Sequence, residues 1–405
     1  MIMNGTRYRW PVLWAAFFSY LIDSYDLIVL AIAMPVLLKV LHMSLPEGGL
    51  LGSATMAGAI AGSVLFGLIA ENRGKRFSLV LALIWLGIGM GAVYLVNSWM
   101  HWMILRFFTG LALGGLWGPC AALIAEHWSP QYRGRAASFV FSSFAIGASL
   151  ASWVGRMVLS VQWQLLFLTG IVSIPIAFLV FRLTPPDAQR LPALDQAVSP
   201  SLKVGIGAIF TRDIMPKTIM GTLISVVNLA GYWGAAFWIP TFLTTERGLS
   251  LTTMAGFSFV MYIGMFLGFQ FFGILSDWMG RRKSMISAFL TAAVAVAVYV
   301  VVHQPMFLFW WGIAVGFGLC GVGGVLGAYY AELFPDHLRA YAGGFCWNMG
   351  RIGAVLAPYT IGYVGRTHGL QTGLTLTSGV YVMGAIILFF MPETFRCRNA
   401  DHVSA

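Results

Sequence analysis

The chain has 405 residues, of which 59% are hydrophobic and only 9% are charged, and its formal net charge is +10. Soluble domains carry about a quarter charged residues, so this composition excludes a water-soluble globular protein. The apolar runs are too long for barrel strands, and they predict membrane helices of about 20 residues each.

Twelve apolar runs follow one another along the chain, separated mostly by short turns. Six fall in each half of the sequence, which predicts an all-α membrane protein with twelve transmembrane helices in a lipid bilayer. The predicted spans are 11–38, 48–70, 77–97, 100–125, 136–159, 164–183, 217–243, 251–276, 284–303, 306–331, 341–364 and 370–391.

The positive charge is distributed unevenly over the turns. If the N-terminus is cytoplasmic, 18 of the 24 Lys and Arg residues fall in cytoplasmic segments, and only Lys39, Arg156, Arg247 and Arg366 fall on the other side. This asymmetry follows the positive-inside rule and predicts that both termini lie in the cytoplasm, with the protein in the inner (plasma) membrane. Topology thus explains the basic charge, and no nucleic-acid partner is expected.

A stretch near residue 70 is repeated 206 positions later. Residues 67–76 align with residues 273–282, and the same offset carries Glu126 onto Glu332. A constant offset over about 80 residues indicates a duplicated unit, so two pseudo-symmetric halves are expected. The predicted organisation is a six-helix N-terminal half (1–183), a cytoplasmic linker (184–216), a six-helix C-terminal half (217–391) and a cytoplasmic tail (392–405).

The repeated loops resemble a signature of the major facilitator superfamily of transporters, Gly-x-Leu-Ala-Asp-Arg-x-Gly-Arg-Lys. Residues 273–283 match it well, whereas the first copy departs from it at Glu71 and Asn72. The resemblance implies the fold of that superfamily and a cytoplasmic gate in which carboxylates bind basic residues. Because Glu has a longer side chain than Asp, a looser latch is expected in the first half. The resemblance assigns to this gate Gly67, Glu71, Gly74, Lys75, Arg76, Glu126, Arg133, Gly273, Asp277, Gly280, Arg281, Arg282, Glu332 and Arg339.

Two further segments resemble a narrower group, the aromatic acid:proton symporters. Residues 23–27, followed by Pro35, are similar to the Asp-Gly-Tyr/Phe-Asp…Pro motif of that group, with Ser24 in place of the usual Gly. Residues 348–358 resemble its eleventh helix. Carriers of nicotinate-like, sialate-like and sugar-acid substrates share parts of these motifs. The resemblance implies proton-coupled transport of an organic anion.

Two acidic residues, Asp23 and Asp26, lie in the middle of a predicted span. Ionisable groups inside a membrane are costly and mark functional sites. A spacing of three residues puts both carboxylates on one helix face, and in a low dielectric both cannot stay ionised cheaply. The pair is therefore expected to carry or gate a proton, and Arg106 to tune it. The alternative is a permanent ion pair between either Asp and Arg106.

Arg351 lies in the middle of the eleventh predicted span, in a half without a mid-span acid. A guanidinium keeps its proton, so this residue is expected to bind a substrate carboxylate in bidentate geometry. Pairing with Asp23 or Asp26 is the alternative. Aromatic and amide side chains are expected to contact the substrate, although packing is the commoner role of a membrane aromatic. The candidates are Asn348, Asn228, Tyr232, Trp233, Trp117 and Tyr329.

The sequence contains no phosphate-binding loop and no paired-His ligand motif, so neither ATP nor a metal is expected. No cofactor is expected beyond a proton as coupling ion. The sequence shows no cluster of a nucleophile and a base, so an enzyme is not expected. The predicted function is uptake of a small organic anion, most simply an aromatic or related monocarboxylate, by a monomeric proton symporter with alternating access. The alternatives are a carrier of a sugar acid, a sialate-like or other polar carboxylate, or a drug/metabolite antiporter of the same fold.

Overall fold

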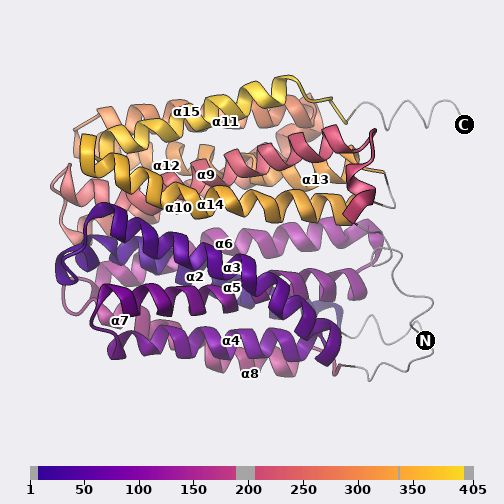
Figure 1. Ribbon diagram of the computed structural model, residues 1–405, viewed down its shortest axis with the longest axis horizontal. Coiled ribbons are helices and arrows are strands. Elements are labelled where there is room, and N and C mark those ends of the chain that lie inside the picture. The colour runs from indigo at the N-terminus through magenta and orange to yellow at the C-terminus, as the bar shows by residue number, and fades with distance from the viewer. Residues whose placement is uncertain (1–7, 188–205, 336–337, 396–405) are drawn as a thin grey trace, which may run out of the picture. The chain divides into compact units, whose positions relative to one another are not determined.

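The computed structural model describes residues 8–187, 206–335 and 338–395. All regular elements in these residues are helices, and Figure 1 shows the long ones running side by side within their units. In chain order they are α2 (Arg9–Val40), α3 (Leu45–Arg73), α4 (Lys75–Gly91), η1 (Ala92–Leu95), α5 (Trp99–His127), α6 (Pro130–Val158), α7 (Gln164–Leu168), η2 (Thr169–Val172), α8 (Ser173–Leu183), η5 (Ile206–Phe210), α9 (Met215–Thr245), α10 (Leu251–Met279), α11 (Arg281–Val301), α12 (Pro305–Gly321), α13 (Gly323–Leu333), α14 (Arg339–His368) and α15 (Leu370–Phe389).

Eleven helical stretches in the described residues are long and apolar enough to cross a membrane. The remaining predicted span, the eleventh (341–364), corresponds to α14, which has 30 residues but a more polar sequence that includes Asn348 and Arg351. The prediction of an all-α membrane protein is therefore confirmed. The sequence did not reveal that η2 interrupts the sixth span or that α12 and α13 together form the tenth.

The helices form two compact units that do not follow chain order. The first contains the described residues of Met1–Ala188, Ala236–Tyr262 and Pro358–Leu370. The second contains those of Gln189–Ala235, Ile263–Ala357 and Gln371–Ala405. The predicted division of the sequence at 184–216 stays a prediction.

The late segments of the first unit are held to each other and to an early helix by close contacts. Trp238 of α9 donates its indole N–H to the carbonyl oxygen of Pro358 in α14, at 2.8 Å. Gly49 of α3 lies against the backbone of Pro358, where a side chain would have no room. Backbone contact at this distance needs glycine, as is common between membrane helices.

Glycines also set the closest helix crossings inside each unit. In the first unit, a Cβ on Gly58 or Gly62 of α3 would overlap the backbone of α5. In the second unit, a Cβ on Gly264 or Gly268 of α10 would overlap the backbone of α12 in the same way. The two pairs are 206 residues apart, so the duplication extends to helix packing. These crossings hold the helices that carry the charged side chains described below.

Candidate functional site

The first feature of the site is a buried ion pair between α2 and α5. Arg106 donates from Nη1 to Oδ1 of Asp26 at 2.9 Å and from Nη2 to Oδ2 at 2.8 Å. The side chains of Arg106 and Asp26 are 2% and 0% exposed. Nε of Arg106 also donates to Oγ1 of Thr55 at 3.2 Å. Bidentate geometry makes this a strong pair, and removal of either partner would leave an uncompensated buried charge.

The neighbours of Asp26 fix the rotation of α2. The backbone of α2 at Leu21 and the hydroxyl of Ser24 lie so close to Gly147 of α6 that a Cβ there would overlap them. On the next residue, the hydroxyl of Tyr25 lies 2.5 Å from Oγ1 of Thr169 in η2. Successive side chains of α2 thus meet α6, η2 and α5, which aims Asp26 at its arginine.

The hydrogen-bond direction at Tyr25 follows from its partner. Oγ1 of Thr169 lies 2.8 Å from the carbonyl oxygen of Leu166 and has one hydrogen, which it donates to that carbonyl. The Tyr25 hydroxyl is therefore the donor toward Thr169. The interruption of the sixth span at η2 places this threonine hydroxyl beside α2.

Asp23 lies one helical turn before Asp26 and is 8% exposed. Its carboxyl group is close to the thiol of Cys120 in α5, which also lies beside Ser19 of α2. The structure therefore shows the ion pair with Arg106 that was the alternative to a proton-carrying acidic pair, and it forms this ion pair with Asp26. Asp23 is a second buried carboxyl group. Their proposed roles in proton coupling stay predictions.

In the second unit, the predicted anion-binding residues lie on α9 and α14. Arg351 and Asn348 are half-buried on α14, and Asn348 donates its side-chain N–H to the carbonyl oxygen of Gly344 at 2.9 Å. On α9, Asn228, Tyr232 and Trp233 are 5%, 6% and 6% exposed. Among the described residues, Oδ1 of Asn228 has no hydrogen-bond partner. A buried amide oxygen in that state can accept a hydrogen bond from a ligand.

The remaining two aromatic candidates lie elsewhere. Tyr329 of α13 is fully buried and donates its hydroxyl to the carbonyl oxygen of Pro392 at 3.1 Å. It therefore lies at the end of the second unit where the charged loop is found. Trp117 belongs to the first unit, where its ring is 4.2 Å from that of Phe141.

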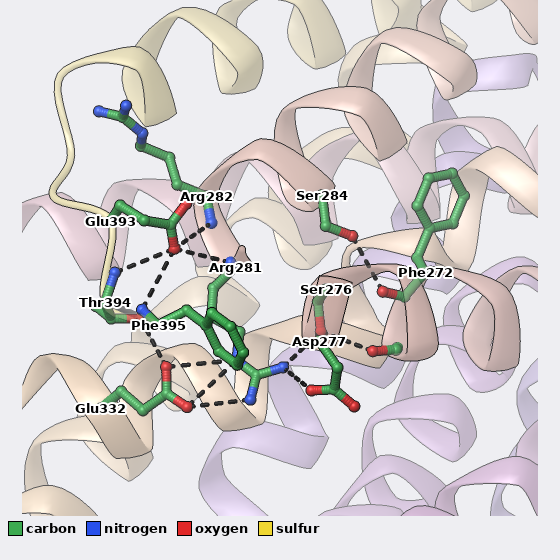
Figure 2. A network of polar contacts seen from close by, with 11 residues as sticks. Phe272, Ser276, Asp277, Arg281, Arg282, Ser284, Glu332, Glu393, Thr394 and Phe395 are labelled. Carbon is green, nitrogen blue, oxygen red and sulfur yellow. Dashed lines mark hydrogen bonds and ion pairs between the residues drawn. The ribbon is translucent and has the colours of Figure 1, made fainter. Parts of the chain in front are cut away.

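The charged loop of the second unit forms a compact network around Arg281 (Figure 2). Arg281 donates to both oxygens of Glu332 at 3.1–3.3 Å, to Oγ of Ser276 at 2.7 Å and to Oδ1 of Asp277 at 2.5 Å. The side chains of Arg281 and Glu332 are only 12% and 14% exposed. The network joins the ends of α10, α11 and α13.

The first unit repeats this arrangement with a simpler pair. Lys75 bonds to Glu126, and these side chains are 33% and 50% exposed. Residues 75 and 126 become 281 and 332 at the offset of 206. Glu71, the counterpart of Asp277, lies exposed at the end of α3. The Lys75–Glu126 pair is thus more open to solvent than the Arg281–Glu332 pair. A looser latch in the first half stays a prediction.

Sequence reasoning missed a second carboxylate in each latch. Oδ1 and Oδ2 of Asp187 accept the backbone N–H groups of Arg76 and Phe77 at 3.0 and 2.9 Å, at the start of α4. In the same way, Oε1 of Glu393 accepts the backbone N–H group of Arg281 at the start of α11, at 2.8 Å. Carboxylates stabilise the N-terminal N–H groups of helices. Pro186-Asp187 and Pro392-Glu393 lie 206 residues apart, so the repeat contained this signal.

The other predicted gate residues occupy the same two loops. Gly74 and Gly280 have φ angles of 102° and 97°, a conformation that favours glycine. Arg76 lies over the ring of Phe181 at 3.6 Å. The side chain of Arg133 lies outside the described residues. Gly67 of α3 and Gly273 of α10 have room for a Cβ atom. Arg282 donates from Nη1 to the carbonyl oxygen of Met391 at 2.9 Å, and Arg339 is exposed at the start of α14.

Comparisons with known proteins agree with this architecture. The family model "Major Facilitator Superfamily" matches residues 16–358 and 258–400. The chain is 27% identical over 406 residues to a "Cis,cis-muconate transport protein" of Acinetobacter baylyi, covering 97% of this chain and 98% of that protein. It is 23% identical over 392 residues to a "Benzoate transport protein" of the same species, covering 89% and 84%. The crystal structure of a D-xylose-proton symporter aligns with a TM-score of 0.78 at 18% identity, over 96% of this chain and 99% of that one.

Proposed function

Because this chain belongs to the Major Facilitator Superfamily, we propose that it takes up a small organic anion together with a proton. The family and its twelve-helix fold make it a multi-pass membrane transporter. The muconate and benzoate transport proteins among its relatives support an organic acid as the substrate. The inner membrane, the cytoplasmic termini and transport by a monomer through alternating access belong to the proposal.

The buried pair of Asp26 and Arg106 is the observation that carries proton coupling. A proton that binds Asp26 removes the negative charge that compensates Arg106, which then remains as a cation at 1% exposure. An unpaired buried charge costs several kcal/mol, about 3–5 when one partner of such a pair is removed. Protonation would therefore disfavour this conformation relative to one in which Arg106 is solvated or finds another anion. A ligand that prefers one of two conformations shifts their populations, and a proton acts in the same way.

Arg351 is the group that we assign to the substrate carboxylate. A guanidinium offers a planar pair of N–H donors that matches a carboxylate, and the unpartnered amide oxygen of Asn228 in the same unit adds a hydrogen-bond acceptor for a substrate hydroxyl or N–H group. A sugar acid or other polar carboxylate, or exchange of such an anion for another, is the alternative function. The two charged loops around Lys75 and Arg281 are proposed to act as latches of the cytoplasmic gate.

Uptake by purified protein in liposomes tests the proposal. Labelled benzoate and muconate are offered at equal pH inside and outside, and then with an alkaline interior. We expect each acid to enter faster than it enters protein-free liposomes, to rise above its outside concentration only with the pH gradient, and to lose this rise on addition of a protonophore. Accumulation that ignores the gradient would contradict proton symport.

Variants test the assigned residues in the same assay. Asp26→Asn is expected to abolish gradient-driven accumulation while substrate exchange between loaded vesicles and medium continues. Asp213→Asn is the matched control, because Asp213 is exposed in a loop. Arg351→Ala is expected to weaken anion binding at least tenfold, and Arg366→Ala to leave it unchanged. Concentrative uptake by Asp26→Asn would remove that residue from the coupling mechanism.

A further inference from the structure

Two glycines near the start of α3 lie against late segments of the first unit. A Cβ on Gly49 would come within 2.4 Å of the carbonyl oxygen of Pro358, and a Cβ on Gly52 within 2.9 Å of the ring of Phe237. Trp238 donates its indole N–H to the same carbonyl oxygen and is 0% exposed. We call these five residues, which all belong to the first unit, the glycine lock. Any separation of α3 from the late segments has to break its contacts.

The glycine lock and the charged loop at Lys75 lie at opposite ends of α3. Gly49 and Gly74 are 25 positions apart, which corresponds to about 38 Å along a helix. The loop is held by the ion pair of Lys75 and Glu126, whereas the five residues of the lock carry no charge. Because the lock itself contains no titratable group, a response to protons has to reach it from another part of the unit.

The hydroxyl of Thr55 joins α3 to the buried ion pair, one helical turn after Gly52. Oγ1 of Thr55 donates its one hydrogen to the carbonyl oxygen of Leu51 at 2.8 Å, so it accepts from Nε of Arg106 at 3.2 Å. Thr55 is 1% exposed, and a Cβ on Gly110 of α5 would lie 2.2 Å from its carbonyl oxygen. This stretch of α3 therefore fits closely against the helix that carries the guanidinium, and a movement of the guanidinium removes one of its contacts.

The titratable groups around the ion pair lie on α2 and α5. Asp23 and Tyr25 of α2 flank Asp26 in sequence, and Cys120 of α5 lies beside Asp23. The segments α3, α6 and α8 also pack against α2, but their titratable residues lie only near the helix ends, and α7 and η2 contain none. Arg106 of α5 hydrogen bonds to both Asp26 and α3, so it is the group through which a proton on Asp26 can act on α3.

We propose that Thr55 is a positioning residue that links the protonation of Asp26 to the glycine lock. With Asp26 ionised, Arg106 ties α2, α3 and α5 together and the lock stays closed. A proton on Asp26 removes the partner that fixes the guanidinium, which then turns away from Thr55. The segment of α3 beside the lock loses this bond, and the population shifts toward an open lock. The inference rests on the proposed function, in which a proton binds Asp26 and alternating access separates these segments in one state.

The distance between two spin labels across the lock tests this inference in the purified full-length protein. The labels are attached to Lys39→Cys and Thr367→Cys, which are exposed positions of α2 and α14 in the first unit. Lys39 follows Leu38, whose side chain would meet a Cβ on Gly48 of α3, so its label follows the start of α3. The native cysteines of the described residues are buried and should stay unlabelled, and Cys397→Ser completes the background. Pulsed electron paramagnetic resonance then measures the fractions of closed and open lock.

Variants at Asp26 and Thr55 form a double-mutant cycle in this assay. Asp26→Asn stands in for the protonated carboxyl group and should raise the open fraction about threefold. Thr55→Val keeps the shape of the side chain and removes the acceptor, so it should raise the open fraction alone and leave little further effect for Asp26→Asn. Thr55→Ser keeps the hydroxyl and should preserve the full response to Asp26→Asn.

Thr109→Val is the matched control. Thr109 of α5 is also 1% exposed, and its hydroxyl also donates to the carbonyl oxygen four residues earlier, that of Leu105, at 2.8 Å. The control should therefore repeat the loss of a buried threonine hydroxyl without removing the acceptor of Arg106. We expect Thr109→Val to leave the open fraction unchanged and to leave the response to Asp26→Asn intact.

Each outcome decides for or against the link. An equal response to Asp26→Asn in the Thr55→Val and Thr55→Ser proteins would overturn the role of Thr55 and leave proton symport standing. The absence of any change in distance, or an equal effect of Thr109→Val, would overturn the inference as well. The comparison of Thr55→Val with Thr55→Ser at alkaline pH needs no change at Asp26, so poor folding of Asp26→Asn does not remove the test. A lock that depends on Thr55 in a protein without gradient-driven uptake would support the link and contradict proton symport.

Discussion

The two charged latches provide a matched test of how burial sets the strength of an ion pair. Lys75 and Arg281 occupy equivalent positions of the repeat, and each bonds to the glutamate 51 residues later. Replacement of either by Met keeps an apolar side chain of similar length and removes only the charge and its donors. The difference between the two variants therefore reports the environment of the pair.

Lys75→Met and Arg281→Met should lower the free energy of unfolding by different amounts, because the two ion pairs differ in exposure. Lys75 and Glu126 are 33% and 50% exposed, and exposed pairs of this kind contribute about 0–1 kcal/mol. Arg281 and Glu332 are 12% and 14% exposed, and loss of Arg281 leaves Glu332 with the hydroxyl of Thr394 at 2.8 Å. Because hydrogen bonds to charged groups contribute about 1.5–3 kcal/mol and this site is still partly solvated, we expect a loss of about 2–4 kcal/mol.

Denaturant titration of the purified protein in a mild detergent measures this difference as a change in the free energy of unfolding. High salt should reduce the small effect at Lys75 further and leave most of the effect at Arg281, since buried charges are screened less. Equal losses for Lys75→Met and Arg281→Met would refute the reasoning, because exposure would then not control the strength of the pair.

Three further predictions concern the helices of the first unit. Asp26→Asn or Arg106→Gln alone should cost about 3–5 kcal/mol in the same titration, and the double variant should cost less than the sum of the two. Tyr25→Phe should cost about 1 kcal/mol by loss of one buried hydrogen bond. Gly62→Ala should cost about 1–3 kcal/mol, because its Cβ would overlap the backbone of α5, and Gly67→Ala, which has nothing within 4 Å, should be neutral or stabilising. A costly Gly67→Ala together with a harmless Gly62→Ala would contradict the packing described for α3.

The sequence was informative wherever an interaction recurs at the repeat offset. The partners of Lys75 and Arg281 could be expected because the duplication keeps the same loop and the same glutamate in each half. The spans could be expected because lipid demands long apolar helices. Asp26 and Arg106 stood out because each is a rare charge in an apolar run, and at the offset of 206 Arg106 aligns with Gly312.

Other features depend on contacts that leave no local trace in the sequence. Tyr25 and Thr169 are 144 residues apart, and nothing in either segment specifies that one hydroxyl meets the other. The interruption at η2 lies inside an unbroken apolar run, so hydropathy alone could not reveal it. Asp187 falls in a polar, proline-containing stretch that reads as a linker, and its role is marked only by the distant repeat at Pro392-Glu393. Tertiary packing determined these features, and local composition did not.

A measurement of proton movement tests the central claim most directly. A pH-sensitive dye enclosed in proteoliposomes reports acidification of the interior when muconate, a charged substrate with little passive permeation, is added outside at equal pH. We expect rapid acidification with the wild-type protein, none in protein-free vesicles and none with Asp26→Asn, although that variant still exchanges labelled muconate. Entry of muconate into wild-type vesicles without acidification would contradict proton-coupled transport through the Asp26–Arg106 pair.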